Sequence, residues 1–79
     1  MCLAIPGFIV EISKNGAVVD FGGINRTVAL DLLPDAKVGE YILAHAGFAL
    51  QKLDTKEAHE LIELFQELEL RARELSHEY

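Results

Sequence analysis

The stretch that divides this chain is Asp54–His77, DTKEAHELIELFQELELRARELSH. Before it, short apolar runs alternate with turn residues, which is typical of β-strands, whereas after Asp54 the apolar residues recur about every 3.6 residues. No Gly or Pro interrupts the segment, and Asp54 with Glu57 forms a potential capping box. The change of period predicts a β-rich part over residues 1–53 and one amphipathic helix over residues 54–79, packed on that part.

A helix from about Thr55 to His77 would be roughly 35 Å long, which is longer than a small β-barrel is wide. The last turns of the helix should therefore extend beyond the barrel. Leu64 and Leu70 lie off the apolar stripe of this helix, Leu70 on the opposite face. Single exposed leucines are ordinary on a protein surface, and the alternative interpretation is a docking surface for another protein. The stripe itself comprises Ala58, Leu61, Ile62, Phe65, Leu68, Ala72 and Leu75.

The first thirty residues predict three short strands joined by tight turns. Leu3–Ser13 should be an edge strand with a kink at Pro6-Gly7, because proline cannot donate a hydrogen bond to a neighbouring strand. Asn15-Gly16 predicts a type I′ hairpin, in which both central residues adopt a positive φ. The meander is completed by a strand over Ala17–Phe21, a turn at Gly22-Gly23 and a strand over Ile24–Leu30.

Residues 31–53 should add a connection and two further strands. Asp31–Glu40 predicts a connection with a short helical turn at Leu32-Leu33 and a positive φ at Gly39. The strongly apolar strand Tyr41–Ala46 should be broken by Gly47, after which Phe48–Leu53 continues as a strand or a bulged extension. These elements predict a mainly β fold, either a barrel or a sandwich, that is followed by one helix.

Length, charge and cysteine content exclude several classes of function. The chain has 79 residues, a net charge of −6 and one cysteine, so no intramolecular disulfide can form and a reducing cytoplasm is the expected location. No leader and no apolar run of about 18 residues is present, which argues against export and against a membrane. An acidic chain in which Arg26 and Lys52 are too few to neutralise phosphates is not expected to bind nucleic acid.

Cys2 is the first candidate for chemistry, because it places the one thiol near the start of the chain. A lone cysteine close to a terminus is often an incidental small residue. The functional interpretation is that its soft thiolate binds zinc, copper(I) or iron.

His45 is the second candidate, because alternation along its strand puts it on the face opposite its alanine neighbours. It is either a half-buried histidine with a backbone partner or an imidazole ligand or proton carrier. His59 and His77 lie among glutamates on the helix and are interpreted as solvated.

Enzyme signatures are missing from the chain. There is no glycine-rich phosphate loop, no nucleophile elbow and no Cys-x-x-Cys pair. Cys2 and His45 could form a nucleophilic pair, but so small a barrel offers no obvious cleft to enclose a substrate. A carrier is therefore favoured over a catalyst.

Two motifs carry a resemblance to a known family. They are Met-Cys-Leu-Ala-Ile-Pro-Gly at residues 1–7 and Gly-Glu-Tyr-Ile-Leu-Ala-His-Ala-Gly-Phe-Ala at residues 39–49. With both, the chain resembles the HypC/HupF/HybG family of hydrogenase maturation chaperones over nearly its whole length. The resemblance implies a small OB-like β-barrel followed by one C-terminal amphipathic helix.

The resemblance also implies a non-enzymatic role in building the iron centre of [NiFe] hydrogenases. Members of the family bind HypD while iron acquires cyanide and carbon monoxide, and then escort the Fe(CN)2CO unit to the large-subunit precursor. The iron would be transient cargo and not a permanent cofactor. The alternative is an adaptor that only bridges partner proteins, while the iron stays on HypD.

The resemblance assigns roles to individual residues. Cys2 matches the family's essential thiol, a candidate iron ligand, and His45 takes the family's histidine position as a second candidate metal ligand. Phe8 departs from the family, in which this position is often basic, and suggests an apolar contact instead. The expected partner-binding residues are Met1, Cys2, Leu3, Ile5, Pro6, Phe8, Leu64 and Leu70.

Overall fold

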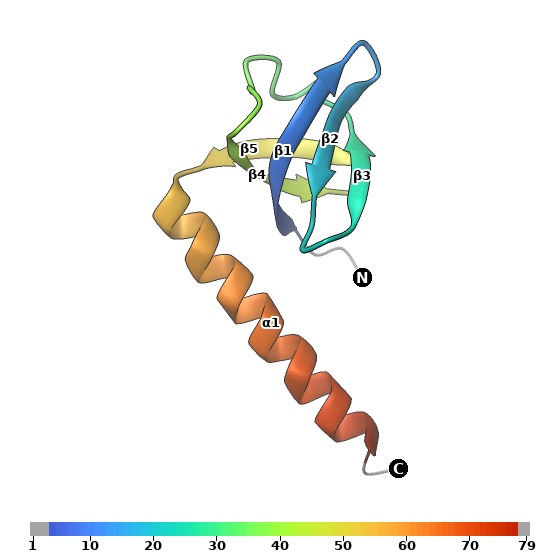
Figure 1. Ribbon diagram of the computed structural model, residues 1–79, viewed down its shortest axis with the longest axis vertical. Coiled ribbons are helices and arrows are strands. Elements are labelled where there is room, and N and C mark those ends of the chain that lie inside the picture. The colour runs from blue at the N-terminus through green and yellow to red at the C-terminus, as the bar shows by residue number, and fades with distance from the viewer. Residues whose placement is uncertain (1–3, 78–79) are drawn as a thin grey trace.

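The computed structural model describes residues 4–77, with side chains described up to Ala72. It contains five strands and one long helix (Figure 1). The elements are β1 Ile5–Ser13, β2 Gly16–Asp20, β3 Asn25–Val28, β4 Tyr41–His45, β5 Phe48–Leu53 and α1 Thr55–His77. This confirms the predicted fold class, a mainly β, barrel-like part followed by one C-terminal helix.

The strands form one sheet in the order β3-β2-β1-β4-β5, and every neighbouring pair is antiparallel. The sheet curls until its two edges meet at one parallel bridge between Ala29 and Phe48. There the Ala29 N–H donates to the Gly47 carbonyl at 2.8 Å, and the Ala49 N–H donates to the Ala29 carbonyl at 3.0 Å. The barrel is thus joined at one point and is not closed along its length. Its order suits an OB-like barrel, a five-stranded and partly open architecture.

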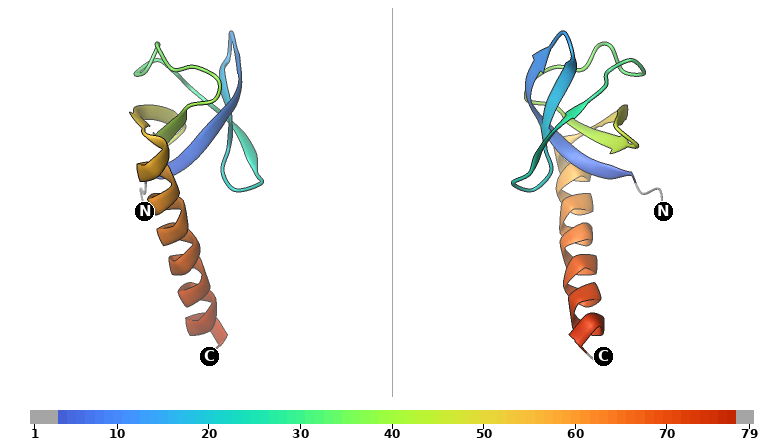
Figure 2. Two further views of the ribbon diagram at one scale, coloured as in Figure 1. Left: turned by 60° about the vertical axis from the view of Figure 1, so that its left-hand side comes forward. Right: turned by 90° about the vertical axis from the view of Figure 1, so that its right-hand side faces the viewer.

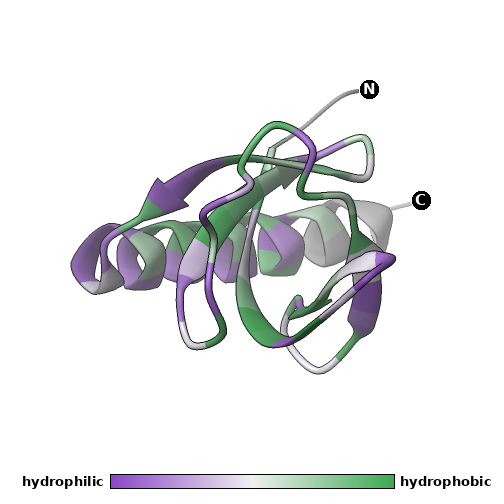
Figure 3. Cartoon of the chain, turned by 90° about the horizontal axis from the view of Figure 1, so that it is seen from above, coloured by the Kyte–Doolittle hydropathy of each residue, from purple (hydrophilic) through white to green (hydrophobic). Residues whose placement is uncertain are grey.

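The core lies inside this curl. Ile9, Val19 and Ile42, from three neighbouring strands, are fully buried. Alternate positions of the strands supply most of the remaining core, as the period of two requires. In Figure 3 the apolar colour follows the curled strands, whereas α1 alternates between hydrophilic and hydrophobic stretches. Ala17, Val28, Ala36, Ala44 and Ala49 complete the buried cluster.

The prediction that the first strand is an edge strand is wrong, because β1 lies in the middle of the sheet. Ile9 donates its N–H toward β4, to the Glu40 carbonyl at 3.0 Å. Alternation therefore turns the nitrogen of Pro6 toward β2, and the pairing of β1 with β2 begins only at Phe8. The missing N–H of Pro6 thus falls on the β2 side of β1, where no residue of β2 pairs with Pro6.

The kink expected at Pro6-Gly7 is also absent, because β1 runs through both residues. The irregularity lies further along, between Ile9 and Glu11 in the pairing with β2. Gly7 has a packing role instead. It is buried, and a Cβ at this position would collide with the side chains of Val19 and Phe21.

The two hairpins differ from their predicted turn chemistry. Neither residue of the Lys14-Asn15 turn has a positive φ, so the predicted type I′ turn is wrong, and the positive φ falls on Gly16, the next residue. The type I′ pattern occurs at Ala46-Gly47, with φ values of 52° and 86°. The strand break expected at Gly47 is therefore a full reversal from β4 into β5, and the bulge lies between Leu43 and Ala44.

The connection between β3 and β4 covers one end of the barrel. It contains three hydrogen-bonded turns and no assigned helix where a short helical turn was expected. In these turns the N–H groups of Leu33, Ala36 and Glu40 donate to the carbonyls of Leu30, Leu33 and Lys37. The expected positive φ at Gly39 is present, at 91°. Ala36 is buried in the core, and Leu30 and Leu33 pack against it. We call this side of the barrel the closed end.

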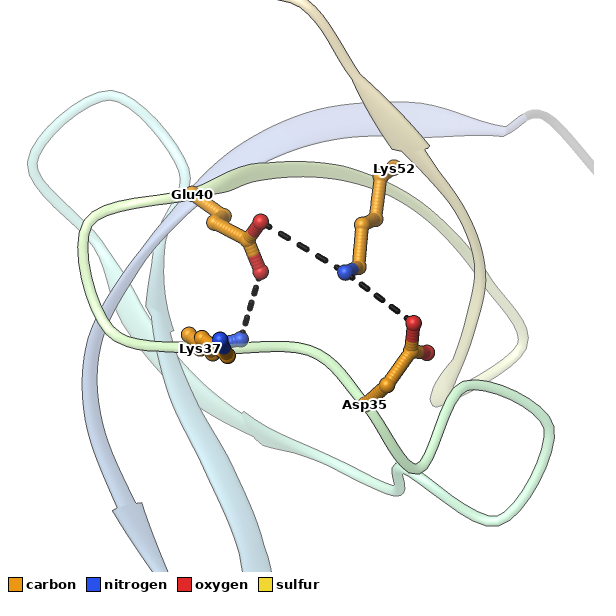
Figure 4. Close-up of polar contacts among 4 residues, drawn as sticks. All are labelled: Asp35, Lys37, Glu40 and Lys52. Atoms are coloured by element: carbon orange, nitrogen blue, oxygen red, sulfur yellow. Dashed lines mark hydrogen bonds and ion pairs between the residues drawn. The ribbon is translucent and has the colours of Figure 1, made fainter.

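Ion pairs tie the closed end to β5. The Lys52 Nζ lies 3.1 Å from a carboxylate oxygen of Asp35 and 3.5 Å from one of Glu40 (Figure 4). Glu40 also accepts a hydrogen bond from the backbone N–H of Lys37 at 2.6 Å. The hydrogen bond from Lys52 lowers the pKa of the Asp35 carboxyl below 3.8 and raises the pKa of Lys52 above 10.5.

Helix α1 begins as its sequence predicts, with the Glu57 N–H donating to the Asp54 carboxylate at 2.8 Å. Ala58 is fully buried against the barrel, whereas Leu64 and Leu70 are 49% and 58% exposed. The later turns extend beyond the barrel, as Figure 2 shows, and the chain measures 45 × 24 × 19 Å. No helix within residues 4–77 is both long and apolar enough to cross a membrane.

Candidate functional site

The register between β1 and β4 brings two of the predicted site residues to one end of the barrel. Ile5, the first residue of β1, pairs with Ala44, and His45 is the next residue of β4. The start of β1 therefore lies beside His45, which the sequence alone did not show. The predicted site residues Met1, Cys2 and Leu3 lie outside the described residues.

A pocket of about 270 Å³ opens at this end of the barrel. We call it the open pocket, and its walls come from β3, from the turn that precedes β3, from the β4–β5 hairpin and from the start of β1. Ile5 is 45% exposed and Ile24 is 60% exposed, so apolar side chains stand free at its rim. Its lining residues are Ile5, Phe21, Ile24, Arg26, Thr27, Val28 and residues 44–47.

His45 is half-buried at the end of β4 and pairs with Phe48 across the tight turn. Ala44 is 6% exposed, so the two neighbours occupy different environments, as alternation predicts. An imidazole at this position can donate or accept one hydrogen bond, or bind a metal as a neutral ligand. Within residues 4–72, no three His, Cys, Asp or Glu side chains gather closely enough to hold a metal ion.

A second hollow lies between the barrel and the helix. This groove, of about 330 Å³, runs between the start of β1 and the face of α1 that carries Ile62 and Phe65. Ile5 borders both the groove and the open pocket, and Pro6 borders the groove. Two of the expected partner-binding residues thus stand where the barrel, the helix and the open pocket meet.

Phe8 lies in an aromatic cluster and not on a free surface. Its ring packs edge-on against Tyr41 with 5.0 Å between ring centroids, and Tyr41 packs in the same way against His59 at 5.5 Å. The Tyr41 hydroxyl and His59 Nε2 also lie within hydrogen-bond distance, at 3.2 Å. His59, which the sequence suggested was simply solvated, therefore links α1 to β4 although it is exposed. No local pattern indicates this contact, because Tyr41 and His59 are 18 residues apart in the chain.

Arg26 lines the open pocket, although the sequence did not mark it as a candidate site residue. It was counted only as a basic residue, too isolated to bind phosphates. A signal was available in the alternation of β3, because Arg26 and the buried Val28 are two residues apart and share one face of the strand.

Comparison of the sequence with known proteins shows the family to which this chain is similar. Residues 1–65 match the HupF/HypC family. The chain is 46% identical over 70 residues to the hydrogenase maturation factor HypC of Cupriavidus necator, an alignment that covers 87% of this chain and 78% of the relative. It is 49% identical over 69 residues to HypC of Azotobacter chroococcum, covering 86% and 82%. The HypC of Helicobacter hepaticus is 41% identical over 70 residues, covering 86% and 81%.

The family match includes both motifs on which the resemblance was based, residues 1–7 and 39–49. It also includes all five strands and the first part of α1, up to Phe65. The resemblance drawn from the sequence is confirmed, and the chain belongs to the HupF/HypC family.

Proposed function

We propose that this chain is a hydrogenase maturation chaperone of the cytoplasm that receives an Fe(CN)2CO unit in a complex with HypD. It then carries that unit to the precursor of a [NiFe] hydrogenase large subunit. Its relatives are named hydrogenase maturation factors, which supports the general role. The observation that carries the finer proposal is the pairing of Ile5 with Ala44, which sets the start of β1 beside His45 and the open pocket.

In this proposal Cys2 holds the iron through its thiolate. Cys2 lies three positions before Ile5 along the chain, and three Cα–Cα steps span at most about 11 Å. The reach of the chain is therefore compatible with a thiolate at the mouth of the open pocket. His45 lines the same pocket and is the second proposed ligand. Thiolate and imidazole both suit iron as ligands. An open coordination position on the iron would let the thiols of a partner protein take the iron by ligand exchange.

Partner binding would use the surfaces that remain apolar after folding. Leu64, Leu68 and Leu70 are each about half exposed on α1, and Ile5 is exposed where the barrel meets the helix. Burial of such side chains would stabilise a complex with HypD or with the large-subunit precursor. We also propose Met1, Cys2 and Leu3 for this contact, whereas Pro6, which is buried, and Phe8, which packs against Tyr41, would support it by positioning the start of β1.

The second candidate function is an adaptor that bridges partner proteins without itself binding iron. The exposed leucines of α1 favour it, because they could dock a partner with or without cargo. The two functions differ in where the iron resides once this chain has separated from HypD. Neither function makes or breaks a covalent bond on a substrate, so both are non-enzymatic.

The test is anaerobic purification of the tagged chain from a hydrogenase-producing host, as wild type and as Cys2→Ala. Infrared absorption reports cyanide and carbonyl ligands on each sample, and partner retention is measured alongside. We expect the wild type to carry both sets of bands after separation from HypD, and Cys2→Ala to lose them while it still binds HypD. A wild type that never shows the bands apart from HypD would establish the adaptor.

The helix surface is tested in the same purification with Leu70→Lys. This side chain is 58% exposed, so the substitution should leave the fold intact while partner retention falls. Circular dichroism of the purified variant checks the fold. Full partner retention by Leu70→Lys would remove Leu70 from the proposed interface.

A further inference from the structure

Arg26 occupies a position in β3 where the fold would place an apolar residue. In the pairing of β2 with β3, Arg26 lies opposite Val19, and Val28 lies opposite Ala17. Directly opposed residues of an antiparallel pair project from the same face of the sheet. Val19 and Ala17 are completely buried and Val28 is 2% exposed, so this is the core-facing side of the sheet. Arg26 therefore shares the face of these residues but lies at the open end of the barrel, where its side chain is exposed to solvent.

A charge at this position breaks the apolar pattern of the buried face that β2 and β3 share, and such breaks are expected mainly at functional positions. Arg26 also has no ion pair with any other residue that the structure describes. The ion pairs within residues 4–72 are those of Lys52 with Asp35 and Glu40, and that of Arg71 with Glu67. In a chain of net charge −6, this guanidinium lines a pocket and has no carboxylate partner from its own described residues.

The open pocket thus has two chemically different sides. Ile5, Phe21 and Ile24 contribute apolar surface, while Arg26 and His45 contribute nitrogen groups. A guanidinium presents five N–H donors and keeps its charge at any physiological pH. A ligand that fits this pocket has a hydrogen-bond acceptor with negative charge on one side and a weakly polar group on the other.

Resting on the proposed function, we propose that the open pocket is the cargo site and that Arg26 is its specificity-determining residue. Its guanidinium donates hydrogen bonds to the cyanide nitrogens of the iron unit. Cyanide carries its negative charge on a terminal nitrogen that accepts hydrogen bonds, whereas bound carbon monoxide is a poor acceptor and suits the apolar wall. Arg26 would therefore fix the orientation of the unit and favour the cyanide-bearing form over bare iron.

A carboxylate from a partner protein could pair with Arg26 as well, and the experiment separates the two ligands. Four proteins are purified anaerobically as above, first together with HypD and then separated from it: the wild type, Arg26→Met, Arg26→Lys and Arg71→Met. Arg71→Met is the matched control, because it removes the same charge from exposed α1, where Arg71 lies 3.6 Å from Glu67. Infrared band positions, band intensity per chain and partner retention are measured for all four.

We expect Arg26→Met to bind the partner normally, to shift both cyanide bands and to retain roughly tenfold less cargo, because charged hydrogen bonds are lost. Arg26→Lys should keep part of the cargo, and Arg71→Met should match the wild type. Unchanged bands in Arg26→Met would overturn the inference and leave the proposed function standing. Loss of partner with unshifted bands would likewise overturn it and assign Arg26 to a partner carboxylate. A wild type without bands would refute the proposed function, and the inference with it.

Discussion

The two ends of this barrel are built from the same sheet but differ in how their basic side chain is paired. At the closed end, the connection buries Ala36 in the core, and Lys52 forms ion pairs with Asp35 and Glu40. At the open end, the exposed Arg26 has no ion pair within residues 4–72. Both ends leave apolar side chains exposed, Ile5 and Ile24 at the open end and Leu32 and Val38 in the connection. A chain this small has little apolar surface with which to stabilise itself. The difference between the ends is therefore the unpaired charge of Arg26 and not the amount of exposed apolar surface.

Gly7→Ala is the substitution that should disturb the open end most. The new methyl group would collide with the side chains of Val19 and Phe21, and Val19 is completely buried. We expect the free energy of unfolding to fall by about 3 kcal/mol, the upper range for overpacking a core. Chemical denaturation followed by circular dichroism measures it. A loss below about 1 kcal/mol would mean that the neighbouring side chains shift to accommodate the methyl group at little cost.

Ala46→Gly should have a smaller effect of opposite sign. Ala46 has a φ of 52°, a conformation that costs an alanine roughly 1–2 kcal/mol and a glycine almost nothing. After allowance for the greater freedom of glycine in the unfolded chain, we expect a gain of about 1 kcal/mol in unfolding free energy. Thermal and chemical unfolding measure the gain. If stability rises while cargo retention is unchanged, the conformation of this turn at the open pocket serves only the fold.

Lys52→Met should have the smallest effect, because the ion pairs of the closed end are exposed to solvent. The folded protein holds the pKa of Asp35 below 3.8, so this carboxylate stabilises the fold above pH 3.8, and its contribution disappears as the pH falls through the lowered value. Wild type should therefore exceed Lys52→Met slightly at neutral pH, and the difference should vanish in acid. Chemical denaturation of both proteins at neutral pH and at acidic pH measures this difference in unfolding free energy. A difference that grows in acid would contradict this assignment.

Local signals predicted the helix well and the turns less well. The apolar period and the Asp54 cap are properties of adjacent residues, and α1 begins at Thr55 and ends at His77 as expected. Asn15-Gly16 is a strong turn signal, yet the positive φ fell on Gly16 alone. The type I′ reversal occurred at Ala46-Gly47, where nothing about an alanine indicates a positive φ. Tertiary strand pairing decided both turns, and it is not encoded in neighbouring residues.

The position of β1 and the role of Arg26 were missed for a related reason. Proline in a strand usually indicates an edge, but Pro6 is tolerated in the central strand because β2 begins to pair only at Phe8. Arg26 became a candidate only once its partner Val19 was known to be buried. The proximity of Ile5 and His45 likewise depends on the register of β1 and β4, which are far apart in sequence.

Nuclear magnetic resonance of the isotope-labelled chain shows which end of the barrel receives the cargo. Amide spectra of the iron-loaded and unloaded protein are compared residue by residue. We predict that the largest shifts fall on residues 24–27 and 44–47, while those of residues 35–40 and Lys52 stay in place. Shifts centred on the closed end, or none at the open pocket in a sample that carries the cargo, would contradict the account.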